Sequence, residues 1–221
     1  MTYSTWELEK QLWSKGYSYI AGIDEAGRGP WAGPVVAGAV CFERNYNKDL
    51  ALRDSKVMSE KAREKAFITI KEVSLAFGIG VIDNVMIDKV GIAEAVLMAM
   101  SKALVNLEQM LKQKVDYLII DGSNVKDIKE YEQNKINKAD ALHCSVSAAA
   151  VLAKVQRDML MKEYAVEFPQ FGFERNKAYG TKEHKEALQK YGPTRIHRFS
   201  YKPVSKVAEK FDIRQIRRGS Y

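Results

Sequence analysis

The chain has 221 residues, of which 46% are apolar and 29% charged, so it can bury one core and lacks the composition of a disordered protein. No apolar run approaches the roughly 20 residues that cross a bilayer, and the first residues lack the basic-then-apolar order of a secretory signal. We therefore expect a cytoplasmic protein without a membrane segment. Cys41 and Cys144 have no CxxC spacing, which favours buried free thiols over a zinc site.

The positive charge is concentrated at the C-terminus. The formal net charge is +7, with an isoelectric point near 9.2. Residues 191–221 contain eight Lys or Arg against two acidic residues, and therefore carry +6 of that charge. Such a segment suits a polyanionic partner, although a solvated tail that only aids solubility is the alternative.

Hydrophobic spacing and turn residues predict strands followed by alternating helices and strands in the first half of the chain. The predicted elements are a helix over Trp6–Lys15, strands over Tyr19–Asp24 and Val35–Phe42, a helix over Glu60–Val73 capped by Ser59, a strand over Leu75–Ile82 and a helix over Gly91–Leu111. The Gly/Pro-rich segment 27–34 is expected to join two neighbouring strands.

The second half is mainly helical. Val115–Ile120 is almost wholly apolar, as expected of a central strand, and polar residues without a predicted element then run from Ser123 to Lys138. The remaining predictions are an Ala-rich helix over Asp140–Glu163, a break at Phe168–Gly172, and helices over Lys182–Tyr191 and Pro203–Phe211. This order predicts a mixed α/β sheet flanked by helices, with a helical C-terminal part.

Four acidic residues are candidates for a metal site. Asp24 and Asp121 each follow an apolar strand, where ligands gather in open α/β sheets, and Asp140 begins the Ala-rich helix. Glu25 can join Asp24 only if the strand breaks there, because neighbours on a regular strand point to opposite faces. Each acid alone could equally be a helix cap or a surface residue.

As a set, the acidic residues indicate metal chemistry, because several ionised carboxylates repel one another unless divalent cations bind between them. Ligation by oxygen alone favours two Mg²⁺ or Mn²⁺ ions, and such a pair cleaves phosphodiesters. Gly27-Arg28-Gly29 follows the acidic pair directly and could hold phosphate, although an isolated triplet of this kind is usually a turn.

Ordered sequence blocks resemble the ribonuclease HII family, or type 2 ribonuclease H, over residues 17–200. The matching blocks are Gly22-Ile23-Asp24-Glu25-Ala26-Gly27-Arg28-Gly29-Pro30, Asp54-Ser55-Lys56, Asp121-Gly122, Lys138-Ala139-Asp140, Val151-Leu152-Ala153-Lys154-Val155-Gln156-Arg157-Asp158, Tyr179-Gly180-Thr181-Lys182-Glu183-His184, Tyr191-Gly192-Pro193 and Ile196-His197-Arg198. The resemblance implies a ribonuclease H-like catalytic domain over residues 1–200, followed by a basic helical tail over 201–221.

The resemblance also implies an endonuclease that cuts the RNA strand of RNA–DNA hybrids. It would incise 5′ to a single ribonucleotide embedded in duplex DNA and leave 3′-hydroxyl and 5′-phosphate ends, a step in removing ribonucleotides from DNA. Asp24, Glu25, Asp121 and Asp140 would be the catalytic metal ligands. The substrate-binding residues would be Gly27, Arg28 and Gly29, which read the ribose 2′-hydroxyl, Tyr179, which stacks on the neighbouring deoxyribose, and Lys56.

Further expectations concern single residues and partners. Lys154 lies on the helix face of Ser147 and could reach phosphate or only cover the core edge. Ala178 and the pair His143-Cys144 depart from the family pattern, and for His184 we favour a structural role over substrate contact. The expected state is a monomer, and the tail has no recognisable clamp-binding motif. Alternative functions are a broader junction or DNA endonuclease and a catalytically inactive nucleic-acid binder.

Overall fold

The computed structural model describes residues 3–48, 50, 52, 58–122 and 127–211. Lys56, predicted to bind substrate, lies outside these ranges. The chain forms two compact units, the first comprising residues 1–26, 36–81 and 96–155, and the second residues 27–35, 82–95 and 156–221. Each unit is described by itself.

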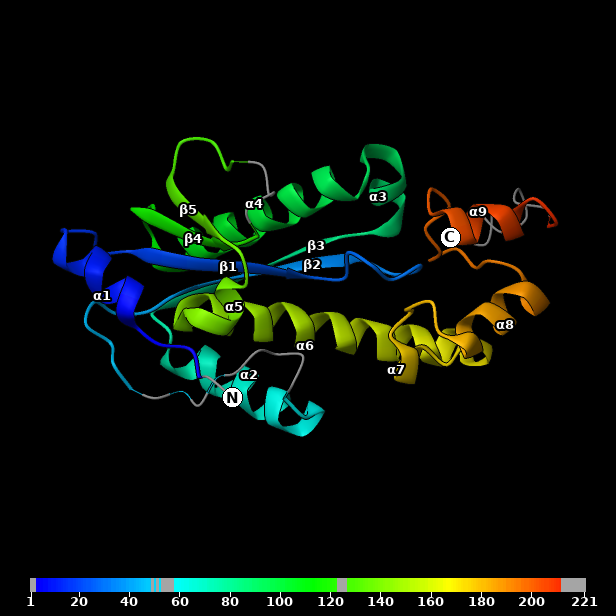
Figure 1. The fold of residues 1–221 in the computed structure, drawn as a ribbon, viewed down its shortest axis with the longest axis horizontal. Coiled ribbons are helices and arrows are strands. Elements are labelled where there is room, and N and C mark those ends of the chain that lie inside the picture. The colour runs from blue at the N-terminus through cyan, green and yellow to red at the C-terminus, as the bar shows by residue number, and fades with distance from the viewer. Residues whose placement is uncertain (1–2, 49, 51, 53–57, 123–126, 212–221) are drawn as a thin grey trace. The chain divides into compact units, whose positions relative to one another are not determined.

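The first unit is built on a five-stranded mixed sheet with the strand order β3-β2-β1-β4-β5 (Figure 1). The strands are β1 (Ile20–Ala26), β2 (Val35–Cys41), β3 (Ala76–Ile82), β4 (Tyr117–Asp121) and β5 (Glu132–Ile136). β1 pairs antiparallel with β2 and parallel with β4, and β4 pairs parallel with β5. The mixed sheet confirms the predicted α/β class.

Helices cover both faces of this sheet. The helices in the first part of the chain are α1 (Glu7–Ser14), α2 (Glu60–Val73), α3 (Asn84–Val90) and α4 (Ile92–Leu111). A Cβ on Gly80 of β3 would meet the backbone of Ala99 in α4, whereas a Cβ on Gly38 of β2 would meet that of Ala149 in α6 (Cys144–Glu167). Figure 1 shows α4 and α6 on opposite faces. Ser59 caps α2 as predicted, its hydroxyl accepting from the Ala62 N–H.

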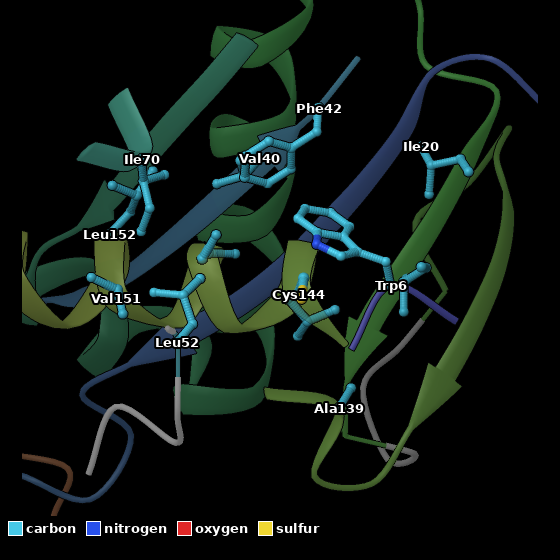
Figure 2. Packing of buried hydrophobic residues seen from close by; sticks show 14 of the residues in the cluster. Trp6, Ile20, Val40, Phe42, Leu52, Ile70, Ala139, Cys144, Val151 and Leu152 are labelled. Carbon is cyan, nitrogen blue, oxygen red and sulfur yellow. The ribbon is translucent and has the colours of Figure 1, made fainter. Parts of the chain in front are cut away.

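The core of the first unit brings together side chains of α6, of β2 and of the segment around the N-terminal helix (Figure 2). Trp6 packs edge-on against Phe42, with ring centroids 5.0 Å apart, and both side chains are buried. Cys41 and Cys144 are buried free thiols, as predicted, and burial raises the pKa of the Cys41 thiol to about 12. The described residues contain no helix that is long and apolar enough to span a membrane.

The second unit is mainly helical and has its own apolar core around Phe171, Phe173 and Leu188. Its elements after α6 are the 3₁₀ turn η1 (Pro169–Phe171), α7 (Phe173–Asn176), α8 (Lys182–Tyr191) and α9 (Lys202–Ala208). The helix α8 has its predicted bounds, whereas α9 ends at Ala208 rather than at the predicted Phe211.

Two regions of regular structure differ more from the sequence prediction. The polar run after Asp121 contains the strand β5, and the predicted helix from Asp140 is two helices, α5 (Ala139–Leu142) and α6. His143 separates them with extended backbone, because it forms a β-bridge with Thr5. The Thr5 N–H donates to the Leu142 carbonyl and the Cys144 N–H to the Thr5 carbonyl, so a distant segment replaces helical hydrogen bonds here.

Candidate active site

Asp24, near the carboxyl end of β1, lies next to Asp121, the last residue of the adjacent parallel strand β4. Ile23 of β1 is paired with Ile120 of β4, so the residue that follows each of them lies beside the other. Parallel strands direct their carboxyl ends to one edge of a sheet, where ligand sites form. Asp24 is only 6% exposed. The register therefore brings together two acids that are almost a hundred positions apart in the chain.

Asp140 and Glu25 complete an acidic cluster around Asp24. Burial raises the pKa of Asp24 well above its usual value, and the charges of Glu25, Asp121 and Asp140 raise it further. The Glu25 N–H donates to Asp24 Oδ1 at 2.7 Å and partly offsets this effect. The Ala139 N–H donates to Asp121 Oδ1, also at 2.7 Å, and so ties the end of β4 to α5, which carries Asp140.

The predicted break in β1 after Asp24 does not occur. β1 continues through Ala26, and Glu25 pairs with Ala37 of β2. Among the neighbouring charges, that of Glu25 nevertheless raises the pKa of Asp24 most. The charge of Glu25 therefore acts on Asp24 from within a continuous strand, in which neighbouring side chains point to different faces.

The four acidic residues influence one another through their charges, but their side chains are not gathered around a common point. In the described parts of the chain, no three Asp, Glu, His or Cys side chains are gathered closely enough to hold a metal ion already. Ionised carboxylates repel one another, and only a cation between them makes close approach favourable. The four side chains offer oxygen donors alone, which fits a hard divalent cation such as Mg²⁺ or Mn²⁺ rather than zinc.

His143 and Cys144, which follow Asp140 in sequence, interact with the N-terminal segment. Burial lowers the pKa of His143, and the charges that act on its ring belong to Glu9 and Glu7 of α1. Cys144 Sγ lies 3.5 Å from Ser4 Oγ. The unusual pair thus packs against α1 and the segment before it. Lys154 is half-buried on α6, which also carries Ser147, so these two residues share one helix as predicted, whereas Asp140 lies in α5.

In the second unit, two buried arginines hold the loop that contains Gly27-Arg28-Gly29. Arg157 donates to the carbonyls of Ala32, Pro34 and Lys177, at 3.0–3.2 Å. Arg198 donates to the carbonyls of Gly27, Arg28, Gly33 and Pro34, at 2.7–3.0 Å. Sequence reasoning missed both roles, although both arginines lie in the motifs quoted above.

Tyr179 lies beside this loop in the same unit. Its ring is 46% exposed, and a Cβ on Gly29 would lie 3.6 Å from its Cε1 atom. The preceding Ala178 is buried and has a left-handed backbone, with φ of 66°, which explains why glycine suits this position. His184 is fully buried and bonds to the Tyr179 carbonyl, which supports the structural role predicted for it.

The sequence matches the family model "Ribonuclease HII" over residues 21–204. It is 47% identical to ribonuclease HII of Clostridioides difficile over 194 residues, covering 88% of this chain and 74% of that protein. It is 46% identical to ribonuclease HII of Acholeplasma laidlawii over 208 residues, covering 94% of this chain and 98% of that protein.

The fold also matches solved structures. Ribonuclease H2 from Pyrococcus horikoshii superposes with a TM-score of 0.72 at 26% identity, covering 87% of this chain and 98% of that one. A second match is the ribonuclease HII of a PCNA complex from Archaeoglobus fulgidus, with a TM-score of 0.68 at 23% identity, covering 87% and 100%. These matches confirm the ribonuclease H-like fold. The chain therefore belongs to the ribonuclease HII family of metal-dependent endoribonucleases, which cleave the RNA of RNA–DNA hybrids and remove ribonucleotides embedded in DNA.

Proposed function

We propose that Asp24, Glu25, Asp121 and Asp140 are the catalytic residues and that they hold two divalent cations, Mg²⁺ or Mn²⁺. The observation that carries this proposal is the strand register that sets Asp121 beside buried Asp24, together with the Ala139 N–H bond that ties Asp121 to the helix of Asp140. The charges of the three other acids raise the pKa of Asp24, in keeping with this arrangement. A ribonuclease HIII of the same fold was solved in complex with Mn²⁺, with a TM-score of 0.65 at 18% identity, covering 89% of this chain and 72% of that one. When bound, the cations would supply an activated water and stabilise the leaving oxygen.

The side chains of the first unit would prepare this site. The Glu25 N–H fixes one oxygen of Asp24, and the Ala139 N–H fixes one oxygen of Asp121, so backbone groups hold both carboxylates in place for a cation. Burial of Asp24 and Asp140 strengthens the electrostatic interactions within the cluster. In the proposed reaction, water attacks phosphorus and the P–O3′ bond 5′ to the ribonucleotide breaks. The 3′-oxygen leaves with a proton, and a 5′-phosphate remains.

We propose that Gly27, Arg28, Gly29 and Tyr179 recognise the substrate. The loop and Tyr179 are neighbours within the second unit, and Arg28, Gly29 and the tyrosine ring are all exposed. Backbone amides can hydrogen-bond to a ribose 2′-hydroxyl, and an aromatic ring can stack on a deoxyribose, which has no 2′-hydroxyl. Such a pair would select the junction between a ribonucleotide and DNA. Lys154 remains a proposed phosphate contact, as does Lys56, which lies outside the described residues.

An incision assay with mapped ends tests these proposals. Three matched duplexes carry one ribonucleotide, a full RNA strand or DNA only. We expect incision 5′ to the single ribonucleotide, loss of activity with a chelator and an inert DNA duplex. Asp24→Asn should abolish incision and retain duplex binding. Full activity of that variant would refute the metal-ligand role, and cleavage of the DNA duplex would favour the broader endonuclease.

We further propose that the enzyme acts as a cytoplasmic monomer and that its basic tail adds sequence-independent duplex affinity. The bacterial relatives act on nucleic acid, and α9 begins this tail, with Val204 and Ala208 buried in the second unit. Truncation after Phe211 removes Arg214, Arg217 and Arg218, which lie outside the described residues, and keeps α9. The truncated protein should bind duplex more weakly, with a shallower salt dependence. An unchanged salt slope would contradict this role.

A further inference from the structure

Arg198 uses its whole guanidinium group on one loop. Nε donates to the Gly33 carbonyl, Nη2 donates to the Gly27 and Pro34 carbonyls, and Nη1 donates to the Arg28 carbonyl and to Tyr201 Oη. A guanidinium has five N–H donors in a fixed fork, so every donor of Arg198 has an acceptor here. The Tyr201 hydroxyl in turn donates to the Arg28 carbonyl at 2.6 Å. Arg198 itself is fully buried.

These bonds determine which way the loop amides point. A trans peptide is planar, so its N–H is directed opposite to its C=O, and the described residues contain no cis peptide bond. The Gly27 carbonyl points to Arg198, and the Arg28 N–H in the same peptide therefore points away from it. The same argument applies to the Arg28 carbonyl and the Gly29 N–H. Arg28 and Gly29 are both exposed, so the two amides are directed to the outer side of the loop.

The shape of the loop depends both on glycine at position 27 and on the donors of Arg198. Gly27 has φ of 103°, which ordinary residues avoid, and a Cβ there would lie 2.3 Å from Arg157 Nε. Its carbonyl is buried against a cation rather than bonded within a helix or sheet. A lysine in place of Arg198 has only three donors and no planar fork, so it could not hold the same four carbonyls.

We propose that Arg198 is a positioning residue for ribonucleotide recognition, and that Tyr201 assists it. By drawing the Gly27 and Arg28 carbonyls inward, Arg198 presents the Arg28 and Gly29 amides as a pair of donors for the 2′-oxygen of the ribose. This assignment rests on the proposed role of the loop in substrate recognition. It makes the guanidinium a determinant of specificity although it never contacts the substrate.

Steady-state kinetics on two duplexes test the proposal. One duplex carries a single ribonucleotide, and in the other a 2′-fluoro nucleotide, which is a poor acceptor, replaces it. Arg198→Lys should raise KM for the ribonucleotide duplex about tenfold and lower the preference for ribose over fluoro-sugar, with a smaller change in kcat. Tyr201→Phe keeps the guanidinium and loses one bridge to the Arg28 carbonyl, so it should raise KM about threefold.

Leu188→Ala is the matched control. Leu188 is buried in the core of the same unit, so its truncation should lower Tm without changing KM or the sugar preference. The proposal is overturned if the two loop variants keep wild-type KM and preference; should Arg198→Lys not fold, Tyr201→Phe alone decides. A wild-type enzyme that cleaved both duplexes equally would instead refute reading of the 2′-hydroxyl by the loop.

Discussion

His184 and His197 are joined by a hydrogen bond between their Nε2 atoms, 3.0 Å apart, inside the second unit. His184 Nδ1 must donate to the Tyr179 carbonyl, so its Nε2 accepts from the His197 N–H. His197 Nδ1 then accepts from the Thr194 N–H at 2.9 Å. This assignment of protons follows from the hydrogen-bond network and requires both rings to be neutral. A further proton on either ring would place two donors against each other.

The histidine pair should make the protein sensitive to acid. Burial, and then the charge of His184, lowers the pKa of His197 to about 3, and burial also lowers that of His184. The unfolded chain therefore binds more protons, so this stability is present above the ordinary histidine pKa of 6.5 and is lost as the pH falls from there towards 3. The free energy of unfolding should fall by up to about 1.4 kcal/mol per pH unit for each histidine. Urea denaturation at several pH values between 5 and 8 measures this pH dependence of the free energy of unfolding.

His197→Gln separates this titration from that of the carboxylates. Glutamine retains an N–H for His184 but does not titrate, so the variant should lose part of the slope below pH 6.5. At pH 8 it should be less stable by about 1–3 kcal/mol, because the Thr194 N–H loses its acceptor. A slope equal to that of the wild type would show that the acid sensitivity arises elsewhere.

Asp24→Asn should not destabilise the metal-free protein at neutral pH. The folded-state pKa of Asp24 is raised above the ordinary value of 3.8, so its stabilising contribution is present below that pH and is lost as the pH rises through the raised pKa. Asparagine keeps an oxygen that accepts from the Glu25 N–H, and it removes the charge repulsion with Glu25, Asp121 and Asp140. In EDTA the variant should melt at or above the wild-type Tm, whereas Mn²⁺ should raise Tm in the wild type only. A large Mn²⁺ shift in the variant would contradict the proposed ligand set.

Gly22→Ala should destabilise the first unit strongly. A Cβ on Gly22 of β1 would lie 2.2 Å from the Ser145 carbonyl carbon and 2.4 Å from the Val146 nitrogen, both backbone atoms of α6. The helix and strand would have to separate, at a cost of about 3 kcal/mol or more. Gly91→Ala is the control: its Cβ meets nothing within 4 Å, so only its backbone conformation, with φ of 81° and ψ of 157°, should lower stability, by about 1–3 kcal/mol. Similar urea midpoints for the two variants would refute this close packing.

The sequence predicted those elements whose signals are local. The helices α2 and α8 have apolar spacing, Ser59 before one and Gly192 after the other, and the structure confirms their bounds. β5 was missed because it is a polar strand at the sheet edge, paired only with β4. The break at His143 was missed because its cause, the bridge to Thr5, lies far away in the sequence.

In the site, too, features with local sequence signals could be predicted, whereas contacts between distant segments could not. The position of Asp24 and Asp121 could be predicted because each follows an apolar strand, and strand ends meet at one edge of a sheet. The roles of Arg157 and Arg198 could not be predicted, since their acceptors lie more than a hundred positions away in the loop, except for the Lys177 carbonyl and the Tyr201 hydroxyl. A buried arginine has no sequence periodicity that reveals its partners, which only the folded chain brings together.

Glu9 should hold the start of α6 in place. Its side chain is 1% exposed, and its Oε1 atom accepts from the Ser145 N–H at 2.9 Å and from Ser145 Oγ at 2.7 Å. A carboxylate at a helix N-terminus also interacts favourably with the helix dipole. Glu9→Ala should therefore cost about 2–3 kcal/mol of unfolding free energy, because a buried N–H loses a charged acceptor. Glu7→Ala, on the exposed face of α1, should change it by less than about 0.5 kcal/mol.

The destabilised start of α6 in Glu9→Ala should also affect the acidic cluster, because only His143 separates α6 from α5, which carries Asp140. A loosened α6 would let Asp140 move away from Asp24, so Glu9→Ala should need several-fold more Mn²⁺ for half-maximal incision, whereas Glu7→Ala should not. Glu9→Gln keeps the acceptor oxygen and loses the charge, so its Mn²⁺ requirement should lie between those of Glu9→Ala and Glu7→Ala. A stability loss in Glu9→Ala with an unchanged metal requirement would show that α6 and the cluster are independent.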